Sequence, residues 1–482
     1  MCERLTRALN HLDGATVDVV VVGGGVIGTA VAARLSSTTA RVALIEIGGD
    51  IANGGSKGNA GVAVSYYYDP ASLDTQLINE SNPRWEELCA RLDVPYRRLG
   101  GLMIARTMDE ADRLPGILAD AIACGAPAEL LSGAQARELE PMITPECTAA
   151  IHLSAEGVID PLRLTAAYAD IAQLNGTIIA LGTKVVAIQH EGDRSHLFTS
   201  AGRISTRFII NAAGLGAAEI SRLAGGEALT SWPRKGQYLV VDREFAQHLR
   251  KIVFSTQMPD TKGANVVPTT HGSALIGPTA EDIEDFDDHA TSTTVLDQVF
   301  EHATTLVPSL TRDRVIKVYA GNRPASDERF RYRFDAVVPN LVHTTSRSSG
   351  VSASPAVGEH TLQLLRDAGL DAEDRRDAVM SLPAFPRLRT ATAPERLIER
   401  DPGFGQVVCA CEMVSAAEIN HALSRPVAAN SIEGIRKRTG ATYGRCQGAM
   451  CMAGISFMCG LATETGPRDV RVTPTGTMGV PS

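Results

Sequence analysis

The first strong hydrophobic pattern in the chain is an apolar run that ends in glycines. Residues 17–22 comprise five valines and one aspartate, a pattern that predicts a short strand buried on both faces of a parallel sheet. Gly23, Gly25 and Gly28 follow at once, and residues 29–35 continue as a helix of small and apolar residues. This strand, turn and helix predict a phosphate site at the N–H groups of a helix N-terminus, with Val26 and Ile27 in its first turn.

A second apolar strand, residues 41–46, ends in an acid. Glu46 lies 18 residues after Gly28, where a carboxylate can accept hydrogen bonds from an adenosine ribose. Together with the glycine turn it predicts a dinucleotide site, although both features serve FAD and NAD equally. The alternative is a glycine-rich turn that binds no ligand.

The apolar pattern then changes along the chain. Helical spacing over 72–92, 108–124 and 161–174 surrounds predicted strands at 99–105, 177–180, 184–188 and 208–214. Between 232 and 319 strands and turns dominate, which predicts an antiparallel sheet with His271 and Gly272 in a hairpin turn. A strand at 341–345 and a helix at 354–365 complete the nucleotide fold.

Several small-residue segments are candidates to contact a cofactor. The segment 54–61 is too rich in glycine for a regular element, and its alternative interpretation is a flexible surface loop. The predicted strand at 208–214 ends in small residues and a glycine, and another glycine precedes the helix at 354–365. The predicted cofactor contacts in and near these segments are Ser56, Lys57, Asn59, Ala60, Gly61, Val185, Ala213, Gly214, Gly350, Val351 and Ser352.

Charge and hydropathy narrow the class of protein. The chain has 482 residues and a formal net charge of −9, which argues against nucleic acid as a partner. No apolar run reaches the about 18 residues of a membrane span. The first residues lack the apolar core of a signal peptide, so we expect a cytoplasmic protein.

The last quarter of the chain collects cysteines. Cys409 and Cys411 form one close pair and, after 34 intervening residues, Cys446 and Cys451 form another. Four thiolates suit a [2Fe–2S] cluster, and zinc is the alternative. Cys459 is an additional cysteine that we expect to be packed in the core.

With these segments identified, residues 17–370 resemble the FAD-dependent family that includes D-amino-acid oxidase, glycine oxidase and glycerol-3-phosphate dehydrogenase. The resemblance lies in the glycine turn with Glu46, the loop 56–61, the strand end 211–214, the segment 319–324 and the turn at Gly350. It implies FAD rather than NAD, and an α/β fold in which a Rossmann-like FAD domain is interleaved with an antiparallel-sheet substrate domain. The FAD parts are expected at about 15–65, 150–225 and 325–370, and the substrate parts at about 66–149 and 226–324, within a unit that spans 15–380.

The cysteine spacing resembles the bacterioferritin-associated-ferredoxin-like [2Fe–2S] module, a small helical domain expected at 406–460. A linker is expected at 381–405 and a disordered tail at 461–482. The combination is similar to subunits of anaerobic glycerol-3-phosphate dehydrogenases and opine oxidases. It implies a dehydrogenase that passes electrons to a second flavoprotein or a quinone-linked subunit. The alternatives are a zinc-stabilised NAD enzyme and a non-catalytic electron-transfer subunit.

The substrate prediction rests on departures from that family. The stretch 348–351 lacks the lysine of glycerol-3-phosphate dehydrogenases, and Val64 replaces the histidine of 2-hydroxyglutarate enzymes. Without an evident base we predict a small amine, amino acid or imino acid, with a 2-hydroxy acid or polyol phosphate as the alternative. Arg323 is the candidate anchor for an anionic group, unless it forms a structural salt bridge, and Tyr238 is a weaker candidate for the pocket.

Overall fold

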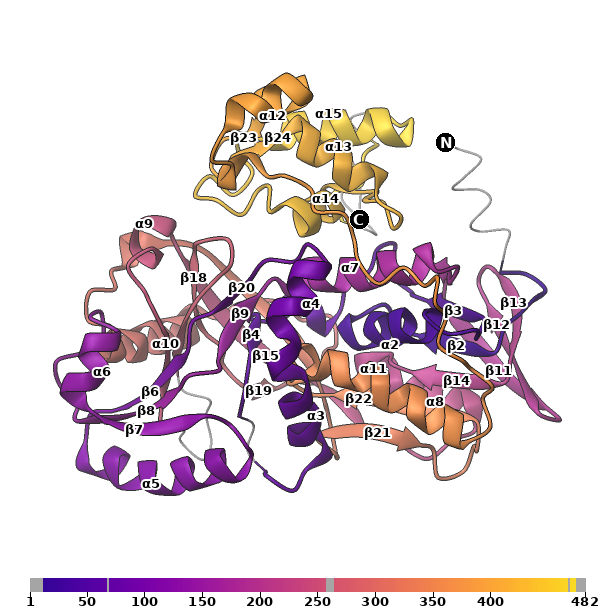
Figure 1. The fold of residues 1–482 in the computed structure, drawn as a ribbon, viewed down its shortest axis with the longest axis horizontal. Coiled ribbons are helices and arrows are strands. Elements are labelled where there is room, and N and C mark those ends of the chain that lie inside the picture. The colour runs from indigo at the N-terminus through magenta and orange to yellow at the C-terminus, as the bar shows by residue number, and fades with distance from the viewer. Residues whose placement is uncertain (1–11, 67–68, 257–263, 467–468, 474–482) are drawn as a thin grey trace.

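The computed structural model describes residues 12–66, 69–256, 264–466 and 469–473. In the view of Figure 1, a nucleotide-binding part lies on the right, a part built on a large sheet lies on the left, and a C-terminal domain lies above both. In the described residues no helix is long and apolar enough to cross a membrane.

The nucleotide-binding part is built on a six-stranded sheet in the order β10-β3-β2-β14-β22-β21. The strands are parallel except for β21, which pairs antiparallel with β22. Alternate residues of the buried strands face opposite sides, as the period of two requires. Val19 and Val21 pack in one core with helices α2 and α11, whereas Val20 and Val22 pack in another with a smaller four-stranded sheet. The bounds of this sheet and its helices are β2 Val19–Val22, β3 Val42–Ile45, β10 Ile178–Ala180, β14 Phe208–Asn211, β21 Phe330–Phe334, β22 Leu341–Ser346, α2 Val26–Ser36, α7 Pro161–Leu174, α8 Ala217–Ala224 and α11 Gly350–Asp367.

The four-stranded sheet has the order β1-β13-β12-β11, and residues 192–193 form the hairpin turn between β11 and β12. It covers one face of the nucleotide sheet, and Val185 at its start packs into the shared core. The bounds are β1 Ala15–Thr16, β11 Val185–Glu191, β12 Arg194–Thr199 and β13 Gly202–Thr206.

The large sheet has nine strands in the order β19-β15-β18-β17-β16-β6-β8-β7, with β20 paired to β15. It is antiparallel apart from the parallel pair β16–β6, which joins the two substrate segments of the chain. Apolar residues from this sheet and from α10 form its core. The bounds are β6 Gly101–Ala105, β7 Ala128–Ser132, β8 Ala149–Leu153, β15 Ser231–Val241, β16 Ile252–Ser255, β17 Asn265–Pro268, β18 Ala274–Gly277, β19 Glu281–Asp282, β20 Val315–Ser326, α5 Met108–Ala123, α6 Gly133–Leu139, α9 Arg243–Ala246 and α10 Thr293–Leu306.

A three-stranded sheet, β4-β9-β5, connects the two parts. The predicted helix over 72–92 is divided here into α3 and α4, with Pro83 in the 3-10 turn between them. Proline cannot continue the hydrogen bonds of a helix interior, so the division follows from the sequence. The bounds are β4 Val62–Ala63, β5 Tyr96–Arg98, β9 Gly157–Ile159, α3 Leu73–Ser81 and α4 Trp85–Arg91.

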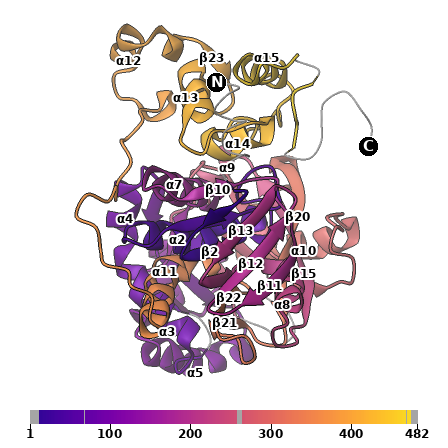
Figure 2. The ribbon, with the colours of Figure 1, turned by 90° about the vertical axis from the view of Figure 1, so that its right-hand side faces the viewer.

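The C-terminal domain packs three helices and a short hairpin around its own apolar core, with α14 toward the rest of the molecule and α15 away from it (Figures 1 and 2). The bounds are β23 Val407–Cys409, β24 Val414–Ser415, α13 Ala416–Ser424, α14 Ile432–Thr439 and α15 Met452–Thr463.

Two segments differ from expectation. The segment 381–405 contains helix α12, Pro394–Arg400, which begins with a proline at a position that tolerates it.

The segment expected to be a disordered tail is ordered where the structure describes it. Residues 461–463 complete α15, and the N–H groups of Ile432 and Glu433 donate to the carbonyls of Arg471 and Val472. Val470 is buried in the domain core. The low hydrophobicity of the segment is offset by these backbone bonds and by one buried valine. Residues 467–468 and 474–482 lie outside the described residues.

Candidate active site

One cavity of about 1590 Å³ lies where the nucleotide sheet, the large sheet and the C-terminal domain meet. A pocket for a drug-sized ligand measures about 300–1,000 Å³. The cavity is therefore large enough for a dinucleotide together with a second small molecule.

The glycine turn forms one end of the cavity, and its glycines have different roles. Gly23 has a φ of +117°, and a Cβ there would lie 2.3 Å from the carbonyl oxygen of Ala212. A Cβ on Gly28 would lie 2.0 Å from the carbonyl oxygen of Gly23. Gly28 therefore allows α2 to pack closely on the strand and does not line the cavity, whereas Gly25 caps the helix that faces it.

Glu46 stands beside this turn, at the end of β3. Its two carboxylate oxygens accept hydrogen bonds from the N–H groups of Gly24 and Gly48, both at 2.6 Å. Burial raises the pKa of Glu46, and these two N–H groups oppose the shift. The carboxylate is thus fixed in the cavity wall, at the place predicted to bind a ribose.

The predicted cofactor residues converge on this cavity. Ser56 accepts a hydrogen bond from the N–H of Val26 at 3.0 Å, so the loop 54–61 folds onto the start of α2. Gly61 does not line the cavity; at φ +73° it turns the chain beside the carbonyl oxygen of Ile159. The other predicted contacts all line it: Gly23, Gly25, Val26, Ile27, Glu46, Ser56, Lys57, Asn59, Ala60, Val185, Ala213, Gly214, Gly350, Val351 and Ser352.

Strand β20 forms the floor of the cavity. Gly321 packs against Gly58 of the glycine-rich loop so closely that a Cβ on either residue would lie 2.7 Å from the Cα of the other. Lys317, Tyr319 and Arg323 share the parity of Gly321 along the strand, and all three line the cavity.

Two aromatic rings stack on this floor. Tyr238 of β15 lies opposite Tyr319 in the ladder, and their ring centroids are 4.8 Å apart. Burial raises the pKa of both phenols. Tyr238 is therefore a packed, neutral wall residue, and its hydroxyl stays protonated at neutral pH.

The predicted anion anchor, Arg323, contacts backbone in this structure. Its guanidinium donates to the carbonyl oxygens of Arg234, Lys235 and Thr279, the last at 2.5 Å. Lys317, which sequence reasoning missed, is half-buried in the same floor. Burial lowers its pKa, and the positive charges of Arg436 and Lys57 lower it further.

A second residue that the sequence did not single out is Glu156, at the other end of the cavity wall. One of its oxygens accepts from the N–H and the hydroxyl of Ser65, at 2.8 and 2.9 Å. The other oxygen is buried without a hydrogen-bond partner among the described residues. Burial raises the pKa of Glu156 to about 7, although the Ser65 donors oppose the shift. Its place opposite Val64 depends on the pairing of β4 with β9, which no local pattern reveals.

The C-terminal domain supplies part of the cavity wall, through Arg436, Tyr443 and Gln447. His271, predicted only as a hairpin residue, lies there too: its Nε2 is 3.0 Å from an oxygen of Asp160, and its ring packs edge-on against Tyr443 at 5.0 Å. The loop that leads to Cys446 is thus part of the same cavity as the nucleotide loops.

The four predicted metal ligands lie together in the C-terminal domain, as two pairs. The thiol of Cys411 contacts that of Cys446, and the thiol of Cys451 contacts that of Cys409. The backbone N–H of Met450 lowers the pKa of Cys446 most strongly, and those of Gly448 and Ala449 add to it. These donors favour a thiolate.

The arrangement distinguishes between the two metal alternatives. Four sulfurs around one zinc lie about 3.8 Å apart. Among the described residues, no three of these cysteines have sulfurs within 4.8 Å of one another. Two pairs, each with two ligands for one metal, fit a [2Fe–2S] cluster, with two cysteines for each iron. Cys459 is fully buried in the domain core, as expected.

Buried ion pairs fix the C-terminal domain on the nucleotide part. Arg438 of α14 makes a two-pronged contact with Asp50, at 2.8 and 2.9 Å, and both side chains are 1% exposed. Near the cysteines, Arg243 and Arg389 both bind Glu412, which follows Cys411. Because both side chains of the Asp50–Arg438 pair are buried, this contact holds the C-terminal domain against the nucleotide part.

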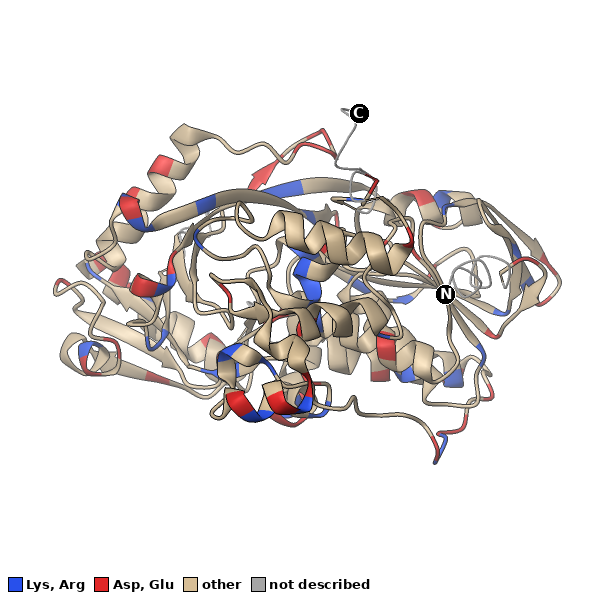
Figure 3. Ribbon diagram, turned by 90° about the horizontal axis from the view of Figure 1, so that it is seen from above, with Lys and Arg blue, Asp and Glu red and all other residues tan. Residues whose placement is uncertain are grey.

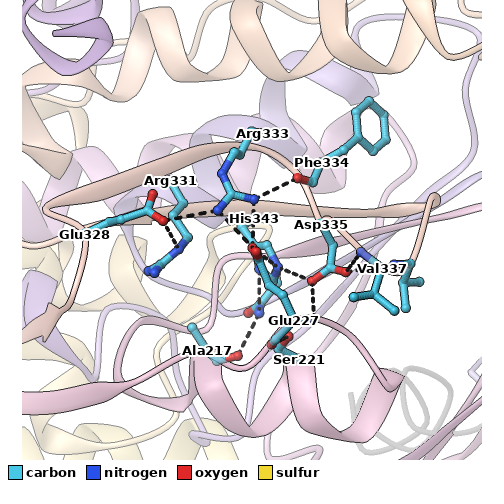
Figure 4. A network of polar contacts seen from close by, with 12 residues as sticks. Ala217, Ser221, Glu227, Glu328, Arg331, Arg333, Phe334, Asp335, Val337 and His343 are labelled. Atoms are coloured by element: carbon cyan, nitrogen blue, oxygen red, sulfur yellow. Dashed lines mark hydrogen bonds and ion pairs between the residues drawn. The ribbon is translucent and has the colours of Figure 1, made fainter.

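A separate group with metal-ligand chemistry lies away from the cavity, where Glu227, Asp335 and His343 meet (Figure 4). His343 donates through Nε2 to Asp335 at 2.9 Å, and Asp335 also accepts from the N–H groups of Val337 and Val338. Arg333 binds both oxygens of Glu227. Protein donors satisfy this network, so it is a structural link between β21, β22 and the segment after α8.

Comparison with known families matches nearly the whole chain. Residues 18–364 match the FAD dependent oxidoreductase family, and residues 407–456 match the BFD-like [2Fe-2S] binding domain. The chain is 30% identical over 445 residues to the glycerol 3-phosphate dehydrogenase of Caloramator mitchellensis, covering 90% of this chain and 92% of that protein. It is 26% identical to one of the subunits of the anaerobic glycerol-3-phosphate dehydrogenase of Escherichia coli K12, covering 91% of this chain and 87% of that one.

Solved structures share the fold of the first part. The FAD-bound L-alpha-glycerophosphate oxidase of Mycoplasma pneumoniae superposes with a TM-score of 0.72 at 27% identity, over 76% of this chain and 99% of that one. Glycine oxidase of Bacillus cereus superposes with a TM-score of 0.66 at 25% identity, over 77% and 100%.

Proposed function

The chain belongs to the family of FAD-dependent oxidoreductases and carries a [2Fe–2S] domain, and we propose that it dehydrogenates a C–OH group of a small anionic substrate, with a polyol phosphate as the first candidate. Electrons would pass through the cluster to a partner subunit. One observation carries the electron path: a single cavity is lined by the nucleotide loops, the floor of β20 and the cluster loop.

The residues present fit FAD. The glycine turn and the N-terminus of α2 would hold the pyrophosphate, Glu46 the ribose, and the loop 54–61 with Gly350–Ser352 the ring system. When bound, FAD accepts two electrons as a hydride, and the cluster carries one electron at a time. The close packing of Gly58 on Gly321 keeps the ring-side loop against the cavity floor.

The preference for an alcohol over an amine rests on two considerations. The amine prediction depended on the lack of a base, and the carboxylate of Glu156, which lines the cavity, is a candidate for that role; its second oxygen is buried and accepts neither of the hydrogen bonds that Ser65 donates. With a pKa of about 7 it is poised to accept the hydroxyl proton at neutral pH. The relatives named above are also glycerol-3-phosphate enzymes.

Lys317 is the proposed anchor of the anionic group. It is half-buried in the cavity floor beside Tyr319, with Arg436, Lys57 and their shared ion-pair partner Glu433 as its charged neighbours. An ammonium in such a site attracts a phosphate or carboxylate, and binding the anion would offset its own desolvation. Arg323 remains a prediction as a second anchor.

The test is an anaerobic substrate panel on the purified chain loaded with both cofactors. We expect sn-glycerol 3-phosphate or a 2-hydroxy acid to bleach the flavin absorbance, and opine-like secondary amines to leave it unchanged. Bleaching by amines alone would restore the first prediction. If no compound bleaches the flavin, the chain is an electron-transfer subunit. Lys317→Met should raise KM for the anionic substrate at least tenfold. Lys317→Arg, which keeps the positive charge, should have a KM much closer to that of the wild type.

A further inference from the structure

Helix α15 has an apolar face that is exposed to solvent. Met450, just before the helix, is 81% exposed, Phe457 is 56% exposed and Leu461 is 66% exposed. Residues spaced three or four apart lie on one side of a helix, so these side chains, with exposed Ala453 and Gly454, form one stripe. We call Met450, Ala453, Gly454, Phe457 and Leu461 the α15 stripe.

The composition around the stripe is unusual for a surface helix. From Cys446 to Thr463 the chain contains no Asp, Glu, Lys or Arg. The opposite side of α15, with Ile455 and Cys459, is buried in the domain core. A helix that is apolar all round is normally covered on every side, whereas surface helices carry charges toward water. The view onto the C-terminal domain in Figure 3 shows uncharged helical segments beside segments with many charged residues.

The position of the stripe indicates what covers it. Cys451 immediately precedes α15, and Met450 lies between it and Cys446, so the stripe begins at the cluster ligands. The other side of the domain is joined to the nucleotide part through Asp50–Arg438 and Arg163–Thr439 contacts. The α15 stripe therefore begins at the cluster ligands and lies on the side of the domain away from the nucleotide part (Figure 2).

We propose that the α15 stripe is the docking surface for an electron-accepting protein subunit with a complementary uncharged apolar patch. This inference rests on the proposed function, in which the cluster passes electrons outward. The lack of charge argues for a lasting subunit contact rather than transient, charge-steered docking. Glu464, which is exposed and ends α15, is a polar residue at the edge of this apolar stripe.

The first experiment is carbene footprinting, read by mass spectrometry, on the recombinant chain alone and on the assembly purified from the native source. Met108, 71% exposed on α5, is the matched control for Met450. We expect both methionines to be labelled in the isolated chain. In the assembly, we expect the label at Met450 to fall at least fivefold and the label at Met108 to stay unchanged. Equal labelling in the assembly would overturn the proposal. Protection of Met450 in a dilute solution of the isolated chain would show that another part of the same chain covers the stripe. Protection that rises with the concentration of the chain would show that a second copy covers it. Either result would overturn the proposal.

The second experiment measures turnover with two acceptors. With the small dye phenazine methosulfate as acceptor, Phe457→Glu should turn over substrate as fast as the wild type. With protein fractions that contain the native acceptor subunit, prepared from a strain that lacks this chain, its turnover should fall at least tenfold. Ile122→Glu, at an exposed site on α5, is the control and should lower neither. Loss of both activities in Phe457→Glu with normal flavin and iron content, or loss of neither, would overturn the proposal. If the wild-type chain reduces no dye with any substrate, the proposed function is wrong. The carbene footprinting experiment would still test whether the α15 stripe is a docking surface.

Discussion

Replacing Asp50 with Asn tests how firmly the cluster domain is held against the flavin cavity. The substitution keeps the shape of the side chain but removes its charge, and it leaves Arg438, buried at 1% exposure, with only the carboxylate of Asp170, already paired with Arg425, as a nearby negative charge. Arg438 keeps its bonds to the carbonyl oxygens of Gly434 and Val427, at 3.1 and 3.0 Å, which neutralise none of its charge. Breaking one side of a buried ion pair costs about 3–5 kcal/mol.

We expect Asp50→Asn to lower the free energy of unfolding by about that amount, measured by urea denaturation with flavin fluorescence as the probe. Proteolysis within 381–405 should also become faster, because the docked domain opens more often. Glu219→Gln is the matched control: it breaks the pair with Arg222 on the exposed surface and should change neither measurement. An unchanged unfolding curve for Asp50→Asn would refute the view that this pair anchors the domain.

The same pair predicts a dependence on pH. Although burial alone would raise it, Arg438 holds the pKa of Asp50 below its usual value of 3.8. A carboxylate with a lowered pKa in the folded state stabilises the protein above its ordinary pKa, and this stability is lost as pH falls through the folded value. The difference between wild type and Asp50→Asn should therefore be full at neutral pH and shrink below about pH 4.

The remaining predictions concern the cofactors and the proposed base. Gly58→Ala should lose FAD on gel filtration, because the added Cβ would lie 2.7 Å from the Cα of Gly321, at a cost of about 1–3 kcal/mol. Gly54→Ala is the control and should retain FAD, because its Cβ would meet no atom within 4 Å. Cys446→Ser should remove the iron and the cluster absorbance, whereas Cys459→Ser should keep both; equal iron in the two variants would contradict the ligand assignment. Wild-type stability should fall by about 3 kcal/mol between pH 4.5 and 7, because Glu156 binds its proton more tightly in the folded state, and Glu156→Gln should abolish this slope. In the same variant the rise of kcat through about pH 7 should disappear, and persistence of that rise would exclude Glu156 as the base.

Features set by neighbours in the sequence could be predicted. The glycine turn, Glu46 and the loop 54–61 form continuous or nearly continuous signals, and the structure places them in one cavity. Spacing groups Cys409 with Cys411 and Cys446 with Cys451, and the structure brings all four together, although the thiol contacts join Cys411 to Cys446 and Cys409 to Cys451. Gly28, the third glycine of the turn, packs α2 closely on the strand, as such a turn requires. Gly61 is predicted to contact the cofactor but turns the chain beside Ile159, because only the folded structure shows what a Cβ would meet.

Features that depend on long-range packing were missed. Lys317 and Glu156 look like ordinary strand residues, and only the contact of β20 with the glycine-rich loop and the pairing of β4 with β9 bring them to the cavity. His271 was interpreted as a hairpin residue, which it is, but its contact with Asp160 joins positions more than 100 residues apart. The helix within 381–405 was hidden by proline, which weakens helical patterns yet is tolerated at a helix start.

The central claim is that electrons from a substrate pass through the flavin to the cluster within this one chain. The most direct test is an anaerobic titration with sn-glycerol 3-phosphate, in which flavin absorbance and the electron paramagnetic resonance of the cluster are recorded on the same samples. We expect the resonance of the reduced cluster to appear as the flavin bleaches, and to be absent in Cys446→Ser. A flavin that bleaches fully while the wild-type cluster stays oxidised would contradict the account.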